Sequence, residues 1–122
     1  MKTITDITEA NILLQRYNGA TAQICMFGIS LKRLALRLTL ANVSEVIYIV
    51  GVSCEHIAGS FAWNNANLSI SSEIDKGTNE TITRIADKKA GFELITTGGF
   101  SVAMGLLNEF GTSFDNFIKK EN

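Results

Sequence analysis

The first apolar positions of the chain recur with the period of a helix. They fall three or four residues apart: Ala10, Leu13, Leu14 and Tyr17. This spacing places them on one face of an amphipathic helix. Asp6 and Glu9 form a capping-box-like pair before them, and Gly19 supplies the left-handed residue at which many helices end. We therefore predict a helix over about residues 6–18.

From residue 20 to residue 105 the pattern changes to the two-residue period of strands. Four leucines alternate with Ala, Arg and Thr: Leu34, Leu36, Leu38 and Leu40. They predict a strand with a core face, and the opposite face carries Arg33 and Arg37. Residues 46–52 are apolar on both faces and rich in β-branched side chains, which is typical of a central strand covered on two sides.

Shorter segments predict the remaining strands. Residues 75–79 have turn chemistry. Residues 82–85 could form a strand, and the segment 80–89 stays open between strand and helix. Segments 92–95 and 100–104 flank a Thr-Gly-Gly sequence at 97–99. This arrangement predicts a hairpin with a short glycine-bearing loop, so we expect the last two strands to pair with each other.

Helical spacing returns near the C-terminus, where four apolar residues follow a possible cap formed by Thr112 and Asp115: Phe110, Phe114, Phe117 and Ile118. The chain of 122 residues has no proline, no internal repeat and no linker-like segment, so residues 1–122 should form one domain. The prediction is an α+β fold with an N-terminal helix, a mostly antiparallel sheet of about 5–7 strands and a short C-terminal helix.

Composition narrows the possible partners. Apolar residues make up 46% of the chain and charged residues only 19%. This charged fraction is low for a monomer whose whole surface faces water, and it suggests a homo-oligomer or a face covered by a partner. The net charge of -1 gives no field that would attract nucleic acid or an anionic membrane. Because the chain shows neither a signal peptide nor an apolar run long enough to span a bilayer, we expect a cytoplasmic protein.

The segment 50–63 holds the only histidine, the only tryptophan and one of the two cysteines. In an extended strand Cys54 and His56 would point to the same side, as a nucleophile and its base must. No family signature surrounds the cysteine, so we favour a structural interpretation in which Cys54 ends the buried strand and His56 marks its polar exit. A single histidine and two cysteines without CxxC spacing predict no metal and no cofactor.

The residues after this strand suggest a contact surface. Phe61 and Trp63 alternate with small residues and are followed by Asn64 and Asn65. Aromatic side chains dominate interface hot spots, so these four residues and His56 form the predicted binding surface. The alternative is that the two aromatics are core residues of a strand, an interpretation that we favour for Phe61 and leave open for Trp63.

Two further features have simple explanations. Arg33 and Arg37 could form a weak anion-binding patch. The simpler explanation is that they lie on a strand face exposed to solvent. Glu93 stands among apolar residues and could act as a general acid or base if buried, but exposure on the opposite face is simpler. The leading functional hypothesis is a non-enzymatic module that binds a protein partner or itself. The alternatives are a small enzyme using Cys54 and His56, and a small-molecule-binding domain.

Overall fold

The structure is a computed structural model that describes residues 2–107. Within these residues the chain forms one α-helix, one short 3₁₀ turn and ten strands. In chain order they are β1 (Lys2–Ile4), α1 (Ile7–Arg16), β2 (Ala20–Gly28), η1 (Ser30–Lys32), β3 (Arg33–Thr39), β4 (Glu45–Gly51), β5 (Cys54–Ala58), β6 (Ala62–Ala66), β7 (Ser69–Ile74), β8 (Thr81–Asp87), β9 (Phe92–Thr96) and β10 (Phe100–Leu106). The predicted C-terminal helix lies outside the described residues.

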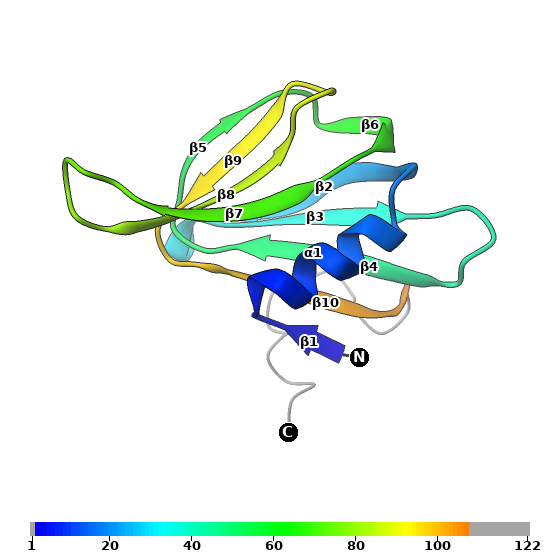
Figure 1. The fold of residues 1–122 in the computed structure, drawn as a ribbon. Coiled ribbons are helices and arrows are strands. Elements are labelled where there is room, and N and C mark those ends of the chain that lie inside the picture. Colours follow the sequence, from blue (N-terminus) through cyan, green and yellow to red (C-terminus); the bar gives the residue numbers. More distant parts are fainter. Residues whose placement is uncertain (1, 108–122) are drawn as a thin grey trace.

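The strands form two antiparallel sheets rather than the single sheet of about 5–7 strands that the sequence predicted. The larger sheet has the order β1-β10-β4-β3-β2-β6, and the smaller has the order β5-β9-β8-β7. Figure 1 shows α1 and the smaller sheet lying against the larger one. All three contribute side chains to one main core. The α+β class with one N-terminal helix is therefore confirmed, and the number and grouping of strands are corrected.

The helix α1 forms where the apolar spacing predicted it. The Asp6 carboxylate accepts a hydrogen bond from the Glu9 amide at 2.9 Å, so Asp6 is the N-cap of the helix. The side chains on the inner face are buried: Ala10, Leu13 and Leu14. The helix thus covers the sheet with the face that the sequence assigned to the core.

The central strands also follow the predicted alternation. Leu34, Leu36 and Leu38 of β3 are buried in the main core. On the opposite face of the larger sheet a second group of side chains is buried: Ala35, Val46, Tyr48, Val50 and Ala103. Strand β4 is consequently covered on both faces, as its apolar sequence indicated.

The predicted pairing of the last two strands is wrong. Strand β9 pairs with β5 and β8 in the smaller sheet, whereas β10 pairs with β1 and β4 in the larger one. The chain changes sheet at Gly98, whose amide donates to the Val52 carbonyl at 3.0 Å. A Cβ at this position would lie 2.9 Å from the same oxygen, so the glycine permits a close crossing between sheets instead of a hairpin turn.

The segment left open between strand and helix is strand β8. It forms a hairpin with β7 around the turn at residues 75–79. The Asp75 amide donates to the Glu80 carbonyl at 2.8 Å, and the Asp75 carboxylate accepts from the Gly77 amide at 3.0 Å. The turn chemistry read from the sequence is therefore confirmed by these hydrogen bonds.

A side chain of α1 covers part of the outer edge of β7. The Asn11 side-chain amide donates to the Ile70 carbonyl at 2.8 Å, and its oxygen accepts from the Ile70 amide, also at 2.8 Å. An open strand edge is a template for pairing with another chain. Asn11 satisfies both edge groups of Ile70 and ties the helix to the smaller sheet.

We expect Asn11→Ala to lower the free energy of unfolding by about 1–2 kcal/mol, because both backbone groups of Ile70 lose their partner in a half-buried place. Urea unfolding measures this change. Gln15→Ala is the matched control, since Gln15 lies exposed on the same helix and its loss should stay within about 0.5 kcal/mol. Equal effects of the two variants would mean that the pair of hydrogen bonds does not stabilise the fold.

Candidate functional site

An apolar slot opens between the two sheets, where β2 and β3 lie opposite β5 and β9. Its volume is about 230 Å³. The residues that line it are Phe27, Leu34, Cys54, Glu55, His56, Ile57 and Leu94. Leu34 and Leu94 are buried and belong to the main core, whereas Phe27 and Ile57 are exposed. The slot is thus a gap in the surface that leads to the edge of the core.

Two backbone hydrogen bonds join the chain segments that border the slot. The Ile24 amide donates to the Phe61 carbonyl at 2.8 Å, and the Ser53 amide donates to the Leu31 carbonyl at 2.9 Å. Between these points, among residues 2–107, neither β2 nor β5 pairs with a further strand on the slot side. Strand β6 pairs with β2 only as far as Gln23, and β5 is the last strand of its sheet. The slot therefore lies between two unpaired strand edges.

Exposed apolar side chains gather in and beside the slot. Five of the large ones are Phe27 (59% exposed), Ile29 (86%), Leu31 (63%), Ile57 (44%) and Phe61 (79%). The interpretation of Phe61 as a core residue is therefore wrong. Leu31 has φ +61, a conformation that non-glycine residues seldom adopt and that the surrounding structure must hold in place. Exposed apolar side chains in such number are uncommon around one opening of a protein surface.

The structure separates Cys54 and His56, which the sequence placed on one side of a strand. A β-bulge shifts the register between them, so Cys54 pairs with Thr96 and His56 pairs with Ile95. Adjacent residues of β9 point to opposite faces, and paired residues share a face. Cys54 consequently faces the core and His56 faces outward. Burial raises the pKa of the Cys54 thiol above its ordinary value, which is the reverse of what a nucleophilic thiolate requires.

His56 ends a row of charged side chains on the outer face of the smaller sheet. Its Nε2 lies 3.6 Å from the Glu93 carboxylate, which accepts from Arg84 Nε at 2.8 Å. Arg84 also pairs with Glu73, and hydrogen bonding to Glu73, with that to Glu93, raises the pKa of the guanidinium. Glu93 is therefore a member of a cross-strand ion network on the surface, and a buried acid or base is not formed there.

The other predicted binding residues lie away from the slot. Trp63 is half-buried: its indole donates to the Asp87 carboxylate at 2.8 Å, and its ring centroid lies 4.6 Å from that of Phe92. Asn64 is exposed and accepts from the Thr21 hydroxyl at 3.1 Å. Asn65 lines a separate small hollow near the end of α1. Of the five predicted binding residues, His56 alone lines the slot. Phe61 is exposed and accepts from the Ile24 amide, while Trp63 connects the two sheets.

The two arginines considered as an anion patch both lie on β3. Arg37 donates to the Gln23 side chain at 2.9 Å, and Lys32 pairs with Glu55 at 3.4 Å beside the slot. Arg33 begins β3 and Arg37 follows four residues later, opposite Gly28 and Gln23 of β2 respectively. Their Cα atoms are thus about 13 Å apart along the strand, and the anion patch stays a prediction.

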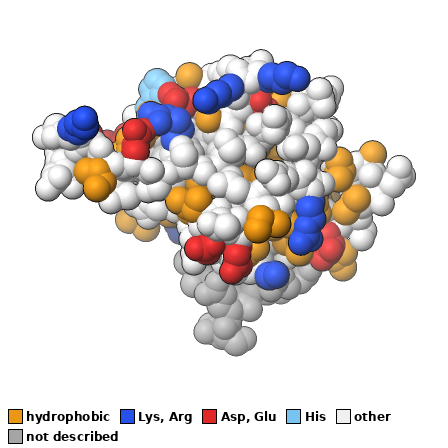
Figure 2. All heavy atoms as spheres, in the orientation of Figure 1, with side chains coloured by type: hydrophobic (Ala, Val, Ile, Leu, Met, Phe, Trp, Pro, Cys, Tyr) orange, Lys and Arg blue, Asp and Glu red, His pale blue; other side chains and the backbone are white. Residues whose placement is uncertain are grey.

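The rest of the described chain offers few other sites. Among residues 2–107 no helix is long and apolar enough to cross a bilayer, and no three metal-ligating side chains gather. Figure 2 shows acidic, basic and apolar side chains interspersed over the visible face. Comparisons with protein-family models, with curated proteins and with solved structures found no match to this chain. The slot and its surroundings are therefore the candidate functional site of the described chain.

Proposed function

We propose that the protein is a non-enzymatic binding module whose slot receives an apolar side chain from an extended segment of a protein partner. The observation that carries this proposal is the coincidence of an apolar gap, two unpaired strand edges and five exposed apolar side chains. A partner that covers this surface removes apolar area from water, which is the main source of affinity in most interfaces.

The chemistry of the slot supports a partner with an apolar anchor. The floor consists of Leu34 and Leu94, while the charged groups stand at the rim as the pair Lys32 and Glu55. An apolar centre with a polar rim is the usual anatomy of a protein interface. The unpaired edges of β2 and β5 offer backbone donors and acceptors to an extended chain beside the anchor.

The enzymatic alternative gains no support from this geometry. The bulge in β5 puts the thiol and the imidazole on opposite faces, and burial raises the pKa of Cys54. A nucleophile needs a base within hydrogen-bond reach and a readily formed thiolate. Binding by the surface around the slot requires neither.

The test uses random linear peptides displayed as a library and selected on the intact protein. We expect selected peptides to carry a large aliphatic or aromatic residue and to bind at least about tenfold more weakly to the Ile57→Lys variant, because a charge at the centre of an interface is poorly tolerated. Ile74→Lys is the matched control, since Ile74 is exposed at the end of β7. Fluorescence anisotropy with labelled peptides measures both affinities.

Three outcomes would contradict the proposal. These are a selection without binders, equal weakening by Ile57→Lys and Ile74→Lys, and binders that lack an apolar residue. Sedimentation velocity on the same variants tests the other occupant. A wild-type dimer that Ile57→Lys dissociates would assign the slot to a second copy of this chain and overturn the assignment to a different protein.

A further inference from the structure

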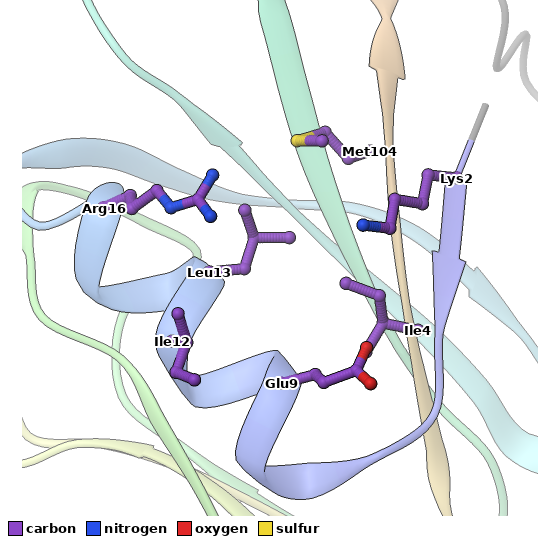
Figure 3. Close-up of a pocket in the computed structure, with 7 residues that line it drawn as sticks. All are labelled: Lys2, Ile4, Glu9, Ile12, Leu13, Arg16 and Met104. Atoms are coloured by element: carbon purple, nitrogen blue, oxygen red, sulfur yellow. The ribbon is translucent and has the colours of Figure 1, made fainter.

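A second hollow lies on another side of the molecule, between α1 and the edge of the larger sheet. Its volume is about 140 Å³. The residues that line it are Lys2, Ile4, Glu9, Ile12, Leu13, Arg16 and Met104, and Figure 3 shows them arranged around one opening. We call this hollow the helix cleft. It shares no residue with the slot.

The floor of the helix cleft is apolar and firmly placed. Ile4 and Leu13 are buried in the main core, and Met104 packs against it. Strand β1 pairs with β10 in a register that sets Lys2 opposite Met104. Only two residues lie between the end of β1 and the start of α1. One continuous stretch of chain therefore builds both walls, and the opening is formed by regular elements rather than by a loop.

Three charged side chains surround this apolar floor. In Figure 3 Lys2 and Arg16 extend from opposite walls toward the space beside Leu13, and Glu9 lies on a third side. None of the three forms an ion pair with another described residue. Two cations held on either side of an apolar surface leave a place where a carboxylate would receive charge-assisted hydrogen bonds from both.

We propose that the helix cleft binds a small carboxylate that carries a short aliphatic chain. The carboxylate would lie between Lys2 and Arg16, and the chain would cover Leu13 and Met104. The volume of about 140 Å³ holds about five groups of methylene or water size at roughly 30 Å³ each. Glu9 disfavours a second negative charge at the same opening, so the site selects a monoanion over a phosphate dianion.

The probes are sodium pentanoate, 1-pentanol and inorganic phosphate, added to protein labelled with carbon-13 at its methyl groups. We expect pentanoate to shift the methyl signals of Leu13 and Met104 in a saturable way, with a Kd on the order of 1 mM for so small a ligand. Pentanol lacks the charge and phosphate lacks the chain. Each should bind at least about tenfold more weakly if both parts of the ligand are recognised.

Variants that each remove one positive charge test where pentanoate binds. Lys2→Gln and Arg16→Gln should each weaken pentanoate binding at least about fivefold, whereas Lys76→Gln removes the same charge from the exposed 75–79 turn and should change nothing. All three residues are exposed, so the variants should remain folded. Absence of saturable shifts, equal binding of pentanol or phosphate, or equal effects of the three variants would each overturn the proposal.

Discussion

Replacing Asp87 by alanine should lower the free energy of unfolding by about 3–5 kcal/mol, a large part of the stability of a domain of this size. Asp87 is 1% exposed. Its carboxylate accepts from the Trp63 indole and the Asn67 amide, each at 2.8 Å, and from the Ala90 amide at 3.2 Å. Alanine leaves these three donors without an acceptor in a place that water reaches poorly.

The loss of stability in Asp87→Ala should come from the lost hydrogen bonds rather than from the lost charge. Asp87→Asn keeps one acceptor oxygen but turns an NH₂ group toward one of the donors, so we expect a smaller loss of about 1–3 kcal/mol. Asp75→Ala is the control, because the hydrogen bond that its carboxylate accepts comes from the Gly77 amide in an exposed turn. Urea unfolding followed by tryptophan fluorescence and circular dichroism measures all three variants.

A double-mutant cycle with Trp63→Phe assigns the part that belongs to the indole. Phenylalanine keeps the aromatic contact with Phe92 and removes only the donor to Asp87. If the bond joins the two sheets as the geometry indicates, the losses of Trp63→Phe and Asp87→Ala should be clearly less than additive. Additive losses, or an Asp87→Ala loss no larger than that of Asp75→Ala, would contradict the role of this carboxylate.

Because of these contacts, a substitution of Trp63 would change the stability of the fold as well as any binding surface. From the sequence Trp63 stood equally well as a core residue or as a contact residue beside Phe61. The structure buries half of it and gives its indole nitrogen an internal partner, while Phe61 is exposed. A loss of binding in Trp63→Ala would therefore mix a change in stability with any change in the surface, and Ile57 or Phe61 is the cleaner position for a test.

The local spacing of apolar residues predicted the helix and the central strands well, because an element that buries one face carries apolar residues at a regular interval. The alternation of Leu34, Leu36 and Leu38 and the spacing of Leu13 and Leu14 both reflect side chains that now lie in one core. Such a regular spacing depends only on neighbours along the chain. It says which face is buried and leaves open which element covers it.

The grouping of the strands into two sheets depended on contacts between distant parts of the chain, which produce no regular spacing of residues in the sequence. Gly51 ends β4 where a Cβ would lie 2.8 Å from the Thr96 side chain, so the two sheets meet closely at this point. In the sequence Gly51 is only a glycine at the end of an apolar run, and Gly98 only part of a turn. Without knowledge of these close approaches, a hairpin between the neighbouring segments was the simplest prediction.

The slot was predictable only in part for the same reason. His56 and Phe61 were singled out, but the bulge at Glu55 was not, and one extra residue reverses which side of a strand faces the core. Phe27, Ile29 and Leu31 alternate with Gly28 and Ser30, a pattern that buried strands share. Their exposure follows from the end of β2 and the bend at η1, which the alternation does not reveal.

Gly59 lies where the chain leaves β5 for β6 and so passes from one sheet to the other. Its φ is +117, and a Cβ would lie 2.9 Å from the Phe92 Cα and 3.0 Å from the Gly91 carbonyl oxygen. Both obstacles are backbone atoms, which cannot turn away as a side chain can. Alanine at this position therefore meets an unfavourable dihedral and a steric clash together.

We expect Gly59→Ala to lower the free energy of unfolding by about 3–4 kcal/mol, measured by urea unfolding. Gly91→Ala is the matched control, since Gly91 has φ +70 but nothing within 4 Å of its Cβ position, and it should cost only about 1 kcal/mol. The difference between the two losses of unfolding free energy measures the cost of the steric clash where the β5–β6 crossing lies close to β9. Similar losses would mean that the crossing can move away from Phe92, and that the edge of β5 beside the slot is less firmly held than its contacts indicate.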